Sequence, residues 1–222
     1  MTNYWRAGLF GRSKSGKSTL MDRMIRNHNR AIVFDAIDER AANAAREGLV
    51  EVTHIGELQE RVRDSYLDGF RFWFHPHYEV DLVQSLSDLS KFMLDIQTQF
   101  GDHYGTDKRP SLLLAVDEMA DCYPNHTMKK GQDAFSNMCR MGRHKGIHLI
   151  GASQRPAEVS TKFRGQLERR FLFNLTEPAD LRAITEMGGT QGADLAEAVR
   201  CLKPLEYIDC HVGEYRHGRL TF

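Results

Sequence analysis

Apolar runs alternate along the chain with segments of helical periodicity. Between residues 82 and 100, apolar side chains recur on one face of a long helix, and the polar, glycine-containing residues 101–110 predict a loop. Strands that alternate with helices favour an α/β fold, in which helices cover both faces of a parallel sheet. Short apolar runs typical of buried strands occur at 31–35, 49–55, 70–76, 111–118, 147–154 and 169–176.

The two ends of the chain follow the same pattern. Residues 4–10 predict a buried strand, and apolar positions between 20 and 28 share one face of a helix that follows it. A further helix is expected at 39–48, and residues 205–222 predict a β-hairpin that turns around 211–213. Because no repeat, low-complexity tract or linker is apparent, residues 1–222 are expected to form a single domain.

A glycine-rich segment lies between the first predicted strand and its helix. It fits the pattern G-x-x-x-x-G-K-[ST], in which backbone N–H groups surround phosphates, the lysine adds a positive charge and the next hydroxyl binds Mg²⁺. The strand before it and the helix after it are the setting that this chemistry needs. The alternative is a Gly/Ser turn with an unrelated lysine. The expected phosphate-binding residues are Gly11, Arg12, Ser13, Lys14, Ser15, Gly16, Lys17, Ser18 and Thr19, with Ser18 on Mg²⁺.

Two acidic residues end the strongly apolar run at 111–118. Asp117 is expected to orient Mg²⁺, and Glu118 to polarise a water for attack on the γ-phosphate, which predicts an ATPase. The long interval between Lys17 and Asp117 leaves room for another strand between their two strands in the sheet, and residues 149–153 are expected to supply it. Gln154 then lies where an amide touches both water and γ-phosphate, although a lone glutamine is also an ordinary loop residue.

The composition is that of a globular protein, with 41% hydrophobic and 27% charged residues. Four cysteines without metal-site spacing are expected to be reduced thiols, and no apolar run reaches the length of a membrane span, so we expect a cytoplasmic protein. Since the formal net charge is +0, any DNA contact requires local basic clusters. The candidates, each of which is alternatively a solvated loop, are Lys129 with Lys130, and Lys162 with Arg164.

Two longer segments carry a resemblance to a known family. The sequences DEMAD (117–121) and RMGRHKGIHLIGASQRP (140–156) resemble the FtsK/HerA superfamily of ring-forming, DNA-pumping ATPases. The resemblance extends over roughly residues 11–173 and implies a RecA-like P-loop NTPase core. The compact chain is similar to the genome-packaging ATPases of tailless, membrane-containing icosahedral viruses.

This resemblance implies a function and a set of partners. We expect a homo-oligomeric ring, hexameric or pentameric, that uses ATP and Mg²⁺ to move double-stranded DNA into a preformed capsid. Its expected partner is a capsid or membrane portal protein, and its expected location is the host cytoplasm or the virion. The resemblance also implies an arginine finger that acts on a neighbouring subunit, for which Arg143 is the first choice and Arg140 the second, ahead of Arg169 and Arg170.

Other functions remain open at the level of sequence. Each arginine is alternatively part of a solvated or salt-bridged helix face. A P-loop kinase for a small molecule needs a basic lid and an acceptor site, and the segments quoted above are not its pattern. A protein-export or filament-assembly ATPase of the same superfamily would act on polypeptide instead of DNA.

Overall fold

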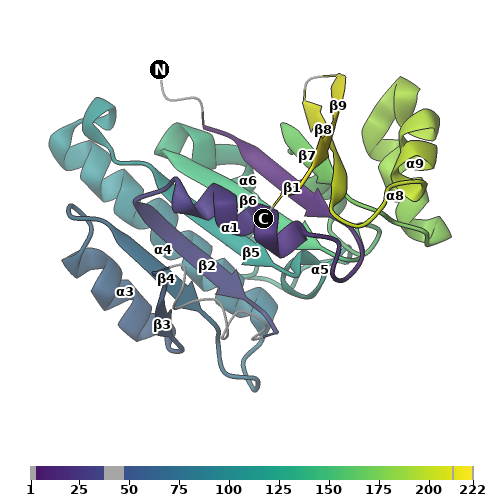
Figure 1. Cartoon of the computed structure of the whole chain (residues 1–222). Helices are drawn as coiled ribbons and strands as arrows, with labels where there is room; N and C mark the ends of the chain where they lie inside the picture. The colour runs from purple at the N-terminus through teal and green to yellow at the C-terminus, as the bar shows by residue number, and fades with distance from the viewer. Residues whose placement is uncertain (1–3, 38–47, 212, 222) are drawn as a thin grey trace.

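A nine-stranded sheet forms the centre of the molecule (Figure 1). The computed structural model describes residues 4–37, 48–211 and 213–221. The strand order is β3-β4-β2-β5-β6-β1-β7-β8-β9; the first seven strands of this order are parallel, and β8 and β9 are antiparallel. This confirms the mainly parallel sheet and the C-terminal hairpin. The strands are β1 (Arg6–Phe10), β2 (Arg30–Asp35), β3 (Val50–Val52), β4 (Phe70–Phe74), β5 (Leu112–Asp117), β6 (Ile147–Ser153), β7 (Arg169–Leu172), β8 (Glu206–His211) and β9 (Glu214–Arg219).

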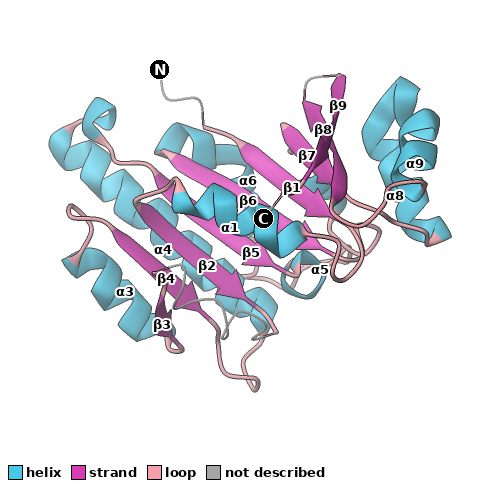
Figure 2. Cartoon of the chain, in the orientation of Figure 1, coloured by secondary structure: helices cyan, strands magenta, loops and turns pink. Residues whose placement is uncertain are grey.

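Helices cover the two faces of this sheet unequally. Figure 2 shows α1 lying across one face, while α4 and α6 lie behind the other face and α8 and α9 stand beside the hairpin. The buried side chains form two clusters, one on each side of the sheet, and α1 supplies the helical part of the smaller cluster. The α-helices of the described residues are α1 (Lys17–Arg26), α3 (Ile55–Asp64), α4 (Leu82–Tyr104), α5 (Met119–Cys122), α6 (Ala134–Met141), α7 (Thr161–Arg164), α8 (Pro178–Gly188) and α9 (Gly192–Arg200).

The loop predicted for 101–110 is wrong at its start, because α4 continues to Tyr104 and a 3-10 turn follows at Thr106–Lys108. Gly101 lies in this last part of the helix, and its missing side chain leaves space for the Arg109 guanidinium, which would collide with a Cβ there. The helix expected at 39–48 lies almost entirely outside the described residues.

The central strands explain why the sequence showed continuous apolar runs. All residues of β1 and β6 are buried, as are the first five of β5, since helices or loops cover them on both faces. Leu149 of β6 pairs with Arg6 of β1 on one side and with Leu114 of β5 on the other. The predicted insertion of this strand between the loop strand and the acidic strand is therefore confirmed.

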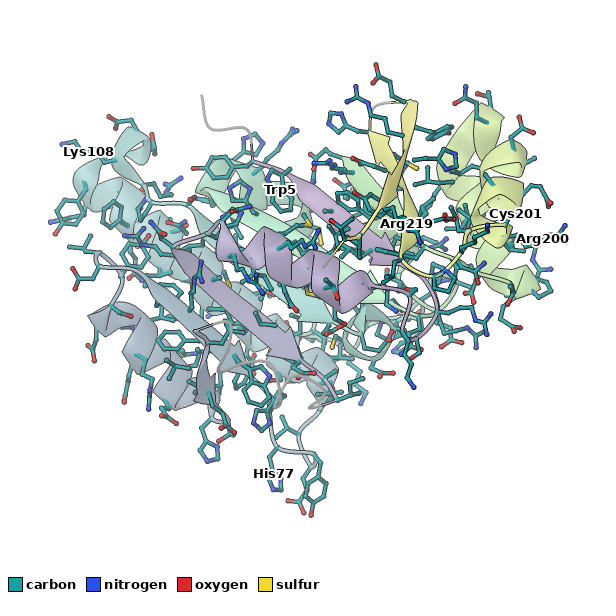
Figure 3. All side chains as sticks on the ribbon, in the orientation of Figure 1. Trp5, His77, Lys108, Arg200, Cys201 and Arg219 are labelled. Carbon is teal, nitrogen blue, oxygen red and sulfur yellow. The ribbon has the colours of Figure 1, made fainter. Side chains whose placement is uncertain are left out.

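A cluster of rings lies at the amino edge of the sheet, near the labelled Trp5 (Figure 3). The buried His148 ring is 4.8 Å from Tyr4, 4.8 Å from His28 and 5.1 Å from Trp5, centroid to centroid. The Trp5 backbone N–H donates to His148 Nδ1 at 3.4 Å. Burial, with a smaller contribution from His28, lowers the pKa of His148 to about 4.

This depressed pKa predicts a pH dependence of stability. In the unfolded chain His148 has the ordinary histidine pKa of 6.5, whereas in the folded chain its pKa is about 4. The contribution of the buried, neutral His148 to the unfolding free energy is therefore fully present above pH 6.5. It is lost as the pH falls from 6.5 to about 4. We expect urea titrations to show that the unfolding free energy of the parent falls as the pH is lowered from 7 to 4. The unfolding free energy of His148→Gln should fall less steeply over the same range. Parallel slopes for the two proteins would contradict this assignment.

Candidate nucleotide-binding site

The glycine-rich loop joins β1 to α1 at the carboxyl edge of the sheet. Lys14 has φ 59° and Gly16 has φ 111°, so the loop turns through left-handed backbone before the helix begins at Lys17. A Cβ on Gly16 would lie 2.6 Å from Leu220 Cδ1, and a Cβ on Gly11 would lie 2.4 Å from Phe173 Cβ. Both glycines of the motif are thus required by close packing, and Gly16 by its backbone angle as well.

The interior of the loop carries groups that fit a nucleotide phosphate. The Lys17 ammonium donates to the carbonyl oxygens of Gly11 at 2.7 Å and Arg12 at 2.9 Å, which holds it inside the loop. The Ser15 hydroxyl is buried and has no hydrogen-bond partner among the residues that the structure describes. A buried hydroxyl and an ammonium beside a helix N-terminus form a suitable set of donors for phosphate oxygens.

The C-terminal segment supports this loop. The Leu205 backbone N–H donates to the Ser15 carbonyl at 3.2 Å, and the Leu220 N–H donates to the Leu205 carbonyl at 2.9 Å. Leu205 adopts φ 69°, which is unusual for a residue with a branched side chain. This support was not predicted, because the hairpin is distant from the loop in sequence and the contact depends on β7 and β8 lying next to β1.

The predicted acidic pair lies at the same edge. Asp117 ends β5 and is in register with Asp35, the last residue of β2. Asp35 is 1% exposed and accepts hydrogen bonds from Trp73 Nε1 at 3.0 Å and from the Ile37 backbone N–H at 3.2 Å. The hydroxyl of Ser18 with these carboxylates is the oxygen-rich donor set that suits Mg²⁺. Sequence reasoning missed Asp35, although its place at the end of a predicted strand was a usable signal.

Glu118 has an unusual backbone and a well-defined carboxylate. It adopts φ 56° and ψ 69°, in the left-handed region. Its Oε1 accepts a hydrogen bond from the Ser153 hydroxyl at 2.5 Å, and its Oε2 accepts one from the Gln154 backbone N–H at 3.3 Å. Burial raises the pKa of Glu118, although these two hydrogen bonds and the charge of Lys17 lower it in part. The structure therefore brings Glu118 and Gln154 together, as the inserted strand requires.

Arg155 follows Gln154 and belongs to a part of the site that the sequence did not assign. Its Nε donates to Asp180 Oδ2 at 3.0 Å, and Asp180 is fully buried at the start of α8. The other carboxylate oxygen of Asp180 accepts the Ala157 backbone N–H at 3.1 Å. Asp180 thus fixes the segment that leaves β6.

The arginines proposed as fingers lie at the opposite edge of the sheet. Arg140 lies in the last turn of α6 and Arg143 lies in the 3-10 turn Gly142–Lys145, both before the amino end of β6. Since β6 is seven residues long, about 20 Å separates them from the loop edge at ~3.3 Å per residue. Both are exposed and neither reaches the phosphate loop of its own chain. Arg169 instead pairs with Asp209, at 2.8 Å from Nε to Oδ1.

The predicted DNA-contacting lysines share one surface hollow. Lys129, Lys130 and Lys162 line a shallow depression of about 850 Å³ formed by residues 125–133 and 160–162. Arg164 lies elsewhere: its Nε donates to the Val159 carbonyl at 3.2 Å, and its Nη1 is 3.6 Å from Glu186 Oε2. The Arg164 side chain is only 6% exposed, so we leave it out of the proposed DNA-contacting surface.

Fold and loop together define the class of protein. A phosphate loop after a central parallel strand, with one strand between it and the acidic strand, is the arrangement of a P-loop NTPase. No protein-family model matches the chain. Within residues 4–37, 48–211 and 213–221, no helix is long and apolar enough to cross a membrane.

Comparison with curated proteins finds relatives of the chain among DNA translocases. The DNA translocase FtsK of Pseudomonas syringae pv. syringae is 30% identical over 163 residues, which cover 72% of this chain and 19% of FtsK. The curated relatives compared are all much longer, and the chain spans between 10% and 19% of their lengths.

Two solved structures share the fold over their whole length. B204, the DNA-packaging ATPase of Sulfolobus turreted icosahedral virus, has a TM-score of 0.73 at 18% identity and covers 100% of both chains. The genome-packaging NTPase B204 of Sulfolobus turreted icosahedral virus 2, in complex with ATP-γS, has a TM-score of 0.69 at 18% identity and covers 99% of this chain and 98% of that one. The chain has the P-loop NTPase fold of these two structures and is similar in part of its sequence to the DNA translocases FtsK and SpoIIIE.

Proposed function

We propose that this chain binds ATP with Mg²⁺, hydrolyses the γ-phosphate and uses the energy to translocate double-stranded DNA. The observation that carries the proposal is the carboxyl edge of the sheet, where Glu118 and Gln154 meet beside the loop that holds Lys17. The similarity to a DNA translocase and to DNA-packaging ATPases supports duplex DNA as the substrate.

Each residue at this edge has a distinct role in the proposed reaction. Backbone N–H groups of the loop and the Lys17 ammonium bind the β- and γ-phosphates. Ser18 and Asp117 would hold Mg²⁺, which supplies positive charge to the phosphate oxygens when bound. Glu118 orients the attacking water and accepts its proton, for which the raised pKa is favourable, and Gln154 contacts the water and the γ-phosphate.

Within this function, we propose more specifically that the chain forms a ring motor that packages a viral genome. Arg143 lies at the edge of the sheet opposite its own phosphate loop, which supports a finger that acts on the neighbouring subunit of a hexameric or pentameric ring. The compact fold shared with viral packaging ATPases supports a capsid or membrane portal protein as docking partner. The host cytoplasm or the virion would then be the place of action.

The lysine hollow supports contact with the DNA backbone. Lys129, Lys130 and Lys162 line it from two segments, and lysine charges can contact backbone phosphates whatever the base sequence. We expect Lys129→Ala with Lys130→Ala to weaken the stimulation of ATP turnover by duplex DNA equally for different sequences. The slope of log affinity against log salt should fall by about 1 for each lysine removed.

Matched variants make this test specific. Lys91→Ala with Lys108→Ala removes two charges outside the hollow, and Lys108 projects near the far end of α4 (Figure 3). We expect the control pair to keep the parent's salt slope, and both pairs to keep turnover without DNA. Stimulation by unfolded polypeptide in place of DNA would favour the protein-export alternative, and an unchanged slope in the Lys129 and Lys130 variant would exclude this hollow.

A further inference from the structure

The Ser153 hydroxyl occupies a central position between the catalytic residues and the rest of the chain. Ser153 is fully buried at the end of β6. Its Oγ accepts the Arg155 backbone N–H at 3.1 Å and donates to Glu118 Oε1 at 2.5 Å. Because a hydroxyl has one proton, this arrangement directs that proton to the carboxylate and fixes where the carboxylate points.

The segments that follow Glu118 and Ser153 in the chain are hydrogen-bonded to each other. One leaves Glu118 through α5, and the other leaves Ser153 through Arg155. The Asn125 N–H donates to the Glu158 carbonyl at 2.7 Å, and the Ser160 N–H donates to the Tyr123 carbonyl at 3.0 Å. An isolated β-bridge between Pro124 and Val159 lies between these bonds.

The joined segments end in the lysine hollow. Asn125 and Ser160 line it directly, and Lys129, Lys130 and Lys162 follow them within a few residues. On the other side, Asp180 holds the second segment through Arg155 and Ala157. The hollow and the catalytic carboxylate are therefore connected by short segments with defined hydrogen bonds.

We propose that Ser153 is a positioning residue, which orients Glu118 for hydrolysis and transmits occupancy of the lysine hollow to it. The inference rests on the proposed function, since it assigns the regulation of the same ATPase site by DNA. DNA phosphates that draw Lys162 and Lys130 together shift the joined segments, and the Ser153 hydroxyl shifts with them. The Glu118 carboxylate follows because its Oε1 is bound to that hydroxyl.

Substitution of Ser153 tests this role, because a positioning residue should affect kcat and leave the KM for ATP nearly unchanged. We expect Ser153→Ala to keep the KM for ATP within about twofold, because no group on the phosphates is lost. At saturating duplex DNA its kcat should fall at least about tenfold, with the ratio of DNA-stimulated to basal turnover close to 1. Ser153→Thr keeps the hydroxyl and should keep most of the stimulation.

A control removes a comparable hydroxyl elsewhere. Ser90 is also fully buried, and its hydroxyl donates to the Leu86 carbonyl at 2.6 Å within α4. Ser90→Ala should keep the parent's ratio of stimulated to basal turnover. If Ser153→Ala is stimulated as strongly as the parent, or if Ser153→Thr loses as much stimulation as Ser153→Ala, the assignment is overturned.

A second measurement uses the parent protein alone. In hydrogen–deuterium exchange, addition of a duplex oligonucleotide to the ATP-γS complex should change exchange of the amides at 119–126 and 153–160. A change at the lysine hollow without one at 153–155 would overturn the transmission while leaving DNA binding intact. A parent whose turnover does not respond to duplex DNA would instead remove the proposed function, and this inference with it.

Discussion

We expect Glu118→Gln to bind ATP as tightly as the parent and to hydrolyse it about 10²–10⁴ times more slowly, the loss expected when a general base is removed. The variant keeps Lys17, Ser18 and Asp117, the residues proposed to hold the phosphates and Mg²⁺, so nucleotide binding should survive. The amide oxygen of glutamine still accepts a hydrogen bond from Ser153, which keeps the local packing. Equilibrium binding of a fluorescent ATP analogue and the rate of phosphate release measure the two properties separately.

An exposed carboxylate on the adjacent short helix provides the control for Glu118. Asp121→Asn removes the same charge three residues further on, and it leaves in place the Ser153 and Gln154 hydrogen bonds that hold the Glu118 carboxylate. We expect this variant to retain turnover within a few-fold of the parent. Near-normal phosphate release by Glu118→Gln would exclude the role of this residue as the base.

Arg143→Ala is expected to fold and bind ATP but to lose about 10³–10⁵ in turnover, the range seen when an arginine finger is absent. The finger neutralises charge that develops only in the transition state, so binding of the ground state is unaffected. Lys145→Ala, in the same 3-10 turn, is the matched control and should stay active. Because the finger acts between subunits, the specific activity of the parent should rise with protein concentration.

Mixing two inactive variants tests the subunit boundary. Arg143→Ala subunits retain Lys17 and Glu118, whereas Glu118→Gln subunits retain Arg143. Interfaces that combine an intact finger with an intact base should recover part of the activity. If the variants co-assemble and no activity returns, Arg143 is not the finger, and Arg140 and Arg170 are the next residues to substitute.

The parts of the site that are local in sequence were predictable. The loop at 11–19 encodes its own conformation through Gly11 and Gly16, and the apolar run before Asp117 encodes a strand buried on both faces. The position of β6 between β5 and β1 was also predictable, because the long interval between Lys17 and Asp117 indicated an inserted strand.

Contacts that depend on sheet register were not predictable from a single sequence. Asp35 lies beside Asp117, and Ser153 bonds Glu118, only because β2, β5 and β6 are aligned side by side. Arg164 looked like a surface cation, since nothing near it in sequence reveals its pairing with Glu186. Charge alone does not distinguish an exposed arginine from one that is held in the interior.

Displacement of a third DNA strand tests the central claim of ATP-driven movement along duplex DNA most directly. A linear duplex carries a labelled triplex-forming oligonucleotide, which a protein moving along the DNA removes. We expect the parent to release the oligonucleotide only with hydrolysable ATP, and Lys17→Ala to release none because its phosphate site lacks the cation. Release of the oligonucleotide by Lys17→Ala at the parent's rate, or DNA-stimulated ATP hydrolysis by the parent with no release, would contradict the assignment as a DNA translocase.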